Sequence, residues 1–221
     1  ADLTTYLPFL IIAIITVVGV VIISQGQRNT PVSYARQARR GRGSSGAVAS
    51  HLPLRVNTAG VIPIIFAISI LLFPPTVAQF FVNGGGRAAQ IANWTIYLFQ
   101  NQWFYGAIYF LLVFGFTYFY TAVVFHPNKI AENLQRQGAF IPGIRPGKQT
   151  EEYIGKTMNR LVFVGAVFLG AIAVLPLIIQ GITGQQNLAL GGTGLLIIVA
   201  VAIDIYKQID AQITMHQYDH I

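Results

Sequence analysis

Residues 52–75 read LPLRVNTAGVIPIIFAISILLFPP, a basic and polar beginning that gives way to an apolar run. No charged side chain follows Arg55 until Arg87, and residues 59–81 alone form an uncharged run of 23 residues. A helix rises about 1.5 Å per residue, so this run can cross a hydrocarbon core roughly 30 Å thick. Pro63 lies in its first third, where a proline removes one backbone donor. We therefore predict a helix inside a bundle, with a weak turn near the end that follows the basic segment.

The composition places the chain among membrane proteins. Of its 221 residues, 54% are hydrophobic and 10% are charged, and the mean hydropathy is +0.59. Soluble domains carry about 25% charged residues, so we predict an all-α integral membrane protein. The chain has no cysteine, its four histidines are scattered, and no nucleophile stands near a base in the sequence. We therefore expect no metal, no cofactor and no enzymatic activity.

Apolar runs of similar length recur along the chain, and they predict five transmembrane helices. These are about 6–23, 59–81, 104–125, 161–179 and 193–209, and the two long segments between them are 25–57 and 126–160.

Short elements are expected between the spans. Residues 88–99 carry tryptophan and tyrosine side chains and predict a short helix in the membrane interface. In the second long segment, Pro127 marks the start of a predicted short helix and Gly138 marks its end. Two Pro-Gly pairs follow and direct Arg145 to a loop tip, and the next helix is expected to start near Thr150. We treat the remainder of both long segments as loop.

The basic residues give the orientation. Segments 25–57 and 126–160 hold twelve of the fourteen Lys and Arg residues. The positive-inside rule places both segments, and the carboxyl end, in the cytoplasm of a multi-pass protein of the plasma membrane. Five spans that start outside are unusual for a complete protein. We therefore expect the chain to be the second part of a larger one.

Several motifs carry a family resemblance. HLPLRVNTAGVIPIIFA (51–67) resembles the start of the seventh helix of the SecY family, the channel-forming subunits of the bacterial protein translocase. HPNKIAENL (126–134) and GAFIPGIRPGK (138–148) resemble the loop between its eighth and ninth helices. GGTGLLI (191–197) and AID (202–204) resemble its tenth helix. Together these motifs cover most of the chain, as helices six to ten of ten.

The resemblance implies a channel that moves secretory polypeptides across the membrane and releases membrane segments into it. Two five-helix halves would form an hourglass, sealed at its waist by aliphatic side chains. Ile65 and Ile197 match positions of this pore ring. The helix at 59–81 matches one wall of the lateral gate, where we single out Pro63, Phe66 and Phe73.

The resemblance also implies partners. The cytoplasmic loops would dock the ribosome or the SecA motor ATPase, through Arg145 and Lys148 in one loop and Arg39, Arg40 and Arg42 in the other. Exposed arginines can bind phosphate or carboxylate in a bidentate manner. Further expected partners are the SecE and SecG subunits, the nascent polypeptide, the lipid bilayer and the first half of SecY. Arg42 is followed here by Gly-Ser-Ser-Gly, which departs from the family pattern.

Two alternatives belong to other classes of protein. Half of a secondary transporter would also contain broken helices, but it would need polar or ionisable residues at mid-membrane depth. The middles of the second and third runs offer Ser69 and Thr117 and no charge. A purely structural scaffold would tolerate charge reversal at Arg145, whereas a docking loop would not.

Overall fold

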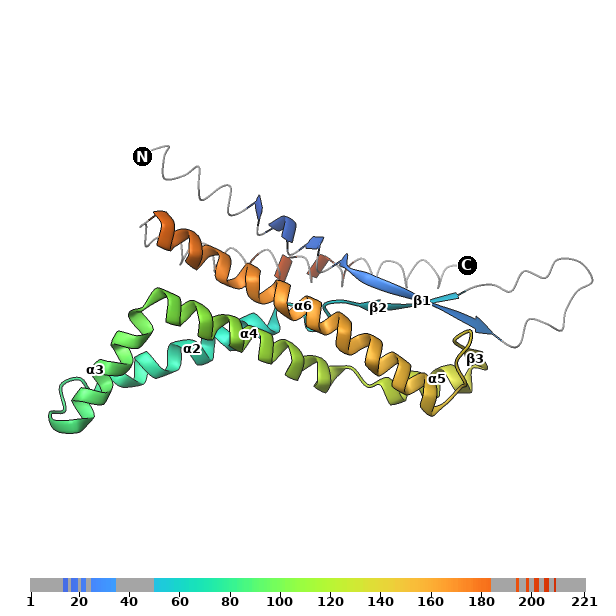
Figure 1. The fold of residues 1–221 in the computed structure, drawn as a ribbon, viewed down its shortest axis with the longest axis horizontal. Helices are drawn as coiled ribbons and strands as arrows, with labels where there is room; N and C mark the ends of the chain where they lie inside the picture. Colours follow the sequence, from blue (N-terminus) through green and yellow to red (C-terminus); the bar gives the residue numbers. More distant parts are fainter. Residues whose placement is uncertain are drawn as a thin grey trace, which may run out of the picture.

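The computed structural model describes residues 26–34 and 50–183, with scattered helical positions from 14 to 25 and from 194 to 209. Most described residues lie in helices that form an elongated bundle. In Figure 1, α3 lies at one end of this bundle, and α5 and β3 lie at the opposite end. The elements in chain order are β1 (Gln27–Tyr34), β2 (Ser50–Arg55), α2 (Ile62–Phe81), α3 (Gly86–Gln100), α4 (Gln102–Val124), α5 (Pro127–Arg136), β3 (Ala139–Phe140) and α6 (Lys148–Thr183).

Three of the described helices, α2, α4 and α6, are long and apolar enough to cross a membrane. They overlap the predicted spans at 59–81, 104–125 and 161–179. The spans predicted at 6–23 and 193–209 lie largely outside the described residues. The short helix expected between the second and third spans is α3.

The three long helices share one core. Tyr109 and Val113 of α4 are buried between Ile64 and Leu71 of α2 and Leu169 of α6. Burial of large apolar side chains from all three helices makes them one packed unit rather than separate spans.

Two glycines of α6 let neighbouring segments approach closely. A Cβ built on Gly170 would lie 2.8 Å from Cδ2 of Phe110, and one built on Gly165 would lie 2.9 Å from the backbone oxygen of Val56. Small residues at helix interfaces allow such close packing in membranes. The lack of a side chain at Gly165 therefore lets the segment before α2 lie directly against α6.

The predicted weak turn at Pro63 is wrong. α2 begins at Ile62, so Pro63 lies in its first turn, where its missing N–H has no helical partner to lose. The weak point lies instead at Pro74 and Pro75, which are both inside the helix. Each of them leaves a carbonyl one turn earlier without its usual donor.

The segment at 25–57 is not simply a loop, because part of it forms a β-hairpin. β1 and β2 pair antiparallel, with Gln27 opposite Arg55 and Thr30 opposite Leu52. The alternating burial of Thr30 and Val32 turns one face of the hairpin inward. The Gly/Ser-rich part of this segment lies outside the described residues.

The second basic segment is also more ordered than predicted. β3 pairs with the end of β1, with Ser33 opposite Phe140, so strands from both segments form one sheet in the order β2-β1-β3. α5 occupies the place where the short helix was predicted. α6 begins at Lys148, two residues before the helix start predicted at Thr150, and continues through the predicted span at 161–179.

Candidate functional site

Two surfaces contain the residues singled out in the sequence. The first is the open face of α2, which we define by Ile65, Phe66, Ile70 and Phe73. Their side chains are exposed in the described part of the chain, although all four are apolar. The second is the basic platform, which we define as β1, β2, β3, α5 and the loop at 141–147.

Ile65 lies on the open face, and its neighbour faces the other way. The side chain of Ile65 is 41% exposed, whereas that of Ile64 is fully buried in the helix core. The structure thus separates two adjacent isoleucines that the sequence alone does not distinguish. Ile197, the second predicted residue of the pore ring, lies outside the described residues.

The three residues singled out for a gate occupy different environments. Phe66 and Phe73 are exposed on α2, and the ring of Phe66 stacks on that of Phe116 from α4, with centroids 6.0 Å apart. Pro63 is buried at the start of the helix. The aromatic stack and the shared core attach α2 firmly to α4.

The basic platform has its own small core. Val32 and Leu54 of the hairpin, Leu134 of α5, Ile141 of the loop and Ile154 of α6 are buried together. Both basic segments therefore contribute to one packed body at one end of the bundle. Ile130, four residues before Leu134 on the same face of α5, also packs against this core.

Arg145 lies at the predicted loop tip, and its backbone is held from both sides. The preceding Ile144 donates its backbone N–H to the carbonyl of Ile141 at 3.0 Å. The hydroxyl of Thr150 donates to the carbonyl of Arg145 at 2.9 Å. Gly143 and Gly147 have φ values of 83° and 98°, a region where other residues are strained. The exposed guanidinium is thus presented on a fixed backbone.

The charges on the platform and on the first turns of α6 are mostly positive. Two exposed ion pairs occur among the described residues there, Arg136 with Glu132 at 2.5 Å and Lys156 with Glu152 at 2.7 Å. Glu152 lies ahead of the apolar part of α6, and its hydrogen bond with Lys156 holds the pKa of its carboxyl below the usual range. Arg145 belongs to neither pair. The positive side chains of the described residues at this end are Arg28, Arg55, Lys129, Arg136, Arg145, Lys148, Lys156 and Arg160.

The structure brings Arg145 and Lys148 together in one short exposed segment. Arg39, Arg40 and Arg42 lie outside the described residues. The predicted helix start at Thr150 lies in the first turn of α6, but the bond from its hydroxyl to the loop tip was not predicted. The hairpin was not predicted either, although the alternation of Leu52 and Leu54 is a signal for a strand.

Known proteins resemble this chain over most of its length. A model of the SecY family matches residues 2–206. The protein translocase subunit SecY of Halalkalibacterium halodurans is 48% identical over 204 residues, which cover 91% of this chain and 46% of that protein. That of Thermotoga maritima is 40% identical, covering 99% of this chain and 48% of its own length. That of Bacillus subtilis is 42% identical, covering 95% of this chain and 48% of its own length. The chain thus spans about half the length of these relatives.

Solved structures show the same fold. The structure of a protein conducting channel matches with a TM-score of 0.60 and 19% identity, over 90% of this chain and 48% of that one. A SecY structure, described as having a plug domain that stabilises the closed channel, matches with a TM-score of 0.59, 19% identity and the same coverage. The fold is thus that of one half of a SecY-type membrane bundle. On the match of the family model to nearly the whole chain, this multi-pass membrane protein belongs to the SecY family.

Proposed function

We propose that this chain forms one half of a channel that passes secretory polypeptides across the plasma membrane and releases apolar segments into the bilayer. The observation that carries the proposal is a SecY-type bundle in which α2 keeps an apolar face uncovered by the other described residues. A complete channel would cover this face with the other half of the subunit or with a polypeptide in transit. The proposal assigns the chain no enzymatic activity.

The open face supplies the constriction in this proposal. The exposed side chain of Ile65 would face the pore and would meet Ile197 and equivalent residues of the other half. A narrow ring of aliphatic side chains excludes ions because water leaves an apolar constriction. Flexible isoleucines would also close around a passing chain.

The lateral gate in this proposal is formed by α2, with Phe66 and Phe73 on its open face. The stack of Phe66 on Phe116 supports a motion in which α2 and α4 move together. The consecutive Pro74 and Pro75 give α2 a site of bending. Pro63 would fix the start of the helix rather than act as its hinge.

The basic platform docks the cytoplasmic partner in this proposal, either SecA or the ribosome, through Arg145 in its loop and the adjacent Lys148 at the start of α6. Arg39, Arg40 and Arg42 would add to the same surface. The shared sheet supports one docking body, because β1 and β3 join the two segments. The platform and the carboxyl end would face the cytoplasm by the positive-inside rule. SecE and SecG would complete the assembly.

Family membership favours this channel over the alternative of half a secondary transporter. A transporter site would need ionisable side chains at mid-membrane depth. None occurs in the described α2 or α4, whose sequences contain no Asp, Glu, Lys, Arg or His.

A cross-linking experiment tests the constriction. A photoreactive side chain is placed at position 65 of the complete subunit, which is reconstituted with a stalled secretory chain. We expect an adduct between position 65 and the stalled chain. The matched controls are position 64, which is buried, and position 164, which is exposed on α6; neither is expected to give an adduct. Equal amounts of adduct at positions 65 and 164 would show that Ile65 does not line the pore.

A further inference from the structure

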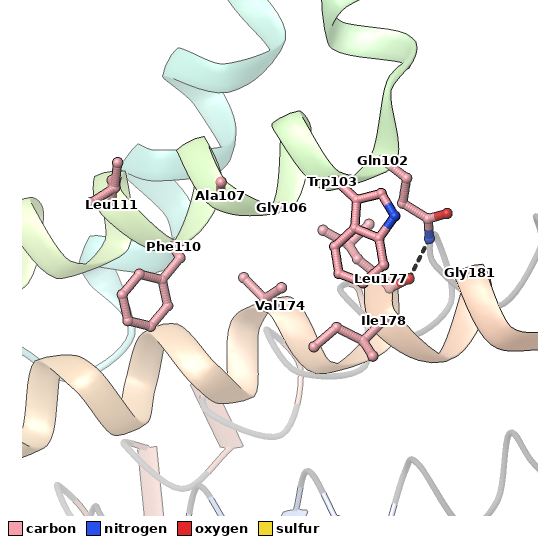
Figure 2. A pocket seen from close by; sticks show the side chains of 10 residues that line it. All are labelled: Gln102, Trp103, Gly106, Ala107, Phe110, Leu111, Val174, Leu177, Ile178 and Gly181. Carbon is pink, nitrogen blue, oxygen red and sulfur yellow. Dashed lines mark hydrogen bonds between the residues drawn. The ribbon is translucent and has the colours of Figure 1, made fainter.

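A groove of about 630 Å³ lies between the first turns of α4 and the last turns of α6, at the end of the bundle opposite the basic platform. Figure 2 shows Gln102, Trp103 and Phe110 along α4, facing Val174 and Ile178 of α6. None of the described residues that line the groove is charged. The proposed role of the bundle as one half of a channel does not require such a groove.

The two ends of the groove differ in polarity. At one end, the amide of Gln102 donates a hydrogen bond to the backbone carbonyl of Leu177, near the turn that Pro176 interrupts. Beside it, Trp103 is 83% exposed, although its ring reaches toward α6. Tryptophan is enriched where the hydrocarbon core meets the headgroups. This end is therefore a polar mouth at the membrane interface.

The other end is closed by packing. Phe110 lies against Gly170, where even a Cβ would come within 2.8 Å of its ring. The residues from Trp103 to Phe110 rise about 11 Å at 1.5 Å per residue. Half of the hydrocarbon core measures about 15 Å. The groove therefore spans most of one leaflet and ends near the middle of the membrane.

This length decides between two kinds of occupant. A transmembrane helix of a partner needs about 30 Å of contact and is about 10 Å wide, so it would continue past the closed end. A lipid acyl chain is narrow, apolar and as long as one leaflet is deep. We propose that this groove binds one acyl chain of a glycerophospholipid, with its headgroup at Gln102 and Trp103. The site is independent of channel activity and is tested without an export assay.

The test uses the complete translocase subunit with its partner subunits, reconstituted in phosphatidylcholine vesicles. A small fraction of the phosphatidylcholine carries a diazirine midway along one acyl chain. After illumination, adducts are mapped by mass spectrometry of peptides. We expect peptides from 103–111 and 174–181 to carry about fivefold more adduct than the residues at the opposite end of α4 (119–124), where Phe119, Val123 and Val124 are exposed. Because vesicles expose both leaflets to the probe, the two ends are directly comparable.

Two variants fill the groove, and a third variant, outside the groove, serves as their control. Ala107→Phe and Ile178→Trp add bulk to its walls, and we expect either to lower the groove adducts about fivefold. Gly115→Phe adds the same bulk to α4 at a position where a new Cβ meets open space, and it should change nothing. Equal labelling at both ends of α4 would overturn the proposal, as would adducts that persist in both filling variants. The proposal would also be overturned if residues 119–124 carried adducts and the groove peptides carried none, because another segment would then cover the groove.

Discussion

The hydroxyl of Thr150 donates a hydrogen bond of 2.9 Å to the backbone carbonyl of Arg145, which closes the loop tip onto the first turn of α6. Thr150 is 1% exposed, so the bond is shielded from water on its donor side. The bond fixes the backbone beneath an exposed guanidinium. The orientation of Arg145 relative to α6 therefore depends on an inward-facing threonine as well as on the arginine itself.

Thr150→Val should slow export because it removes the bond that holds the loop tip. A hydrogen bond of this kind contributes about 0.5–1.5 kcal/mol, so we expect export of a secretory protein to fall by about twofold to twelvefold. The measurement is the rate of translocation into inverted membrane vesicles, at matched subunit levels. Thr150→Ser retains the hydroxyl and should keep most of the activity. Wild-type export by Thr150→Val would show that the loop tip does not need this anchor.

Arg145→Glu should block docking while the protein remains inserted. Reversing the charge at an exposed tip removes bidentate binding to an acidic partner and adds repulsion, so binding of the ribosome or SecA should weaken by more than about tenfold. Binding to vesicles is measured by co-sedimentation.

The matched control for this variant is Arg136→Glu. Arg136 is also exposed on the platform, but it is engaged by Glu132, and exposed pairs of this kind contribute little to stability. We expect partner binding to remain within about twofold of the wild type. If both reversals weaken binding equally, the platform acts through its total charge and Arg145 has no special role.

Ile65→Ser and Ile64→Ser should have different phenotypes, a larger ion conductance for the first and a lower stability for the second. The polar side chain at position 65 would wet the constriction, so we expect a larger ion conductance in planar bilayers with little change in stability. At position 64 it would create a cavity and a buried hydroxyl, which should lower stability by about 2–5 kcal/mol. Conductance and thermal unfolding in detergent are measured for both variants. A leak from Ile64→Ser alone would reverse the assignment of the two faces.

Gly165→Ala should destabilise the bundle because its methyl group would lie 2.9 Å from the backbone oxygen of Val56. Backbone cannot move aside as a side chain does, so we expect a loss of about 1–3 kcal/mol and a lower unfolding temperature. Gly115→Ala on α4 meets open space and should be neutral or slightly stabilising. Equal unfolding temperatures for the two variants would mean that the segment before α2 does not press on α6.

Local signals in the sequence were sufficient to predict the positions of several elements. The long uncharged run predicted α2 to within three residues of its start, because its length and apolarity need no knowledge of a partner. Pro127 and Gly138 likewise bounded α5, since both residues act on the backbone around them. The Pro-Gly pairs placed Arg145 on a turn for the same reason.

Other features depend on residues far apart in the chain. The pairing of Ser33 with Phe140 joins positions more than a hundred residues apart, and two alternating residues are too weak a signal to reveal it. The first turns of α6 contain charges, and the sequence predicted their start near Thr150 but not the surface on which they pack. They are helical in a region where Ile154 is buried against the hairpin and α5.

The sequence by itself determined the membrane class, the approximate positions of α2, α4 and α6 and the segregation of basic residues to two segments, because these follow from composition and local order. The tertiary structure alone decided which side of each helix is covered. Ile64 and Ile65 are chemically identical, and packing against α4 and α6 buries one and leaves the other exposed. The joining of the two basic segments and the groove beside Trp103 are likewise contacts between distant elements, so no local pattern encodes them.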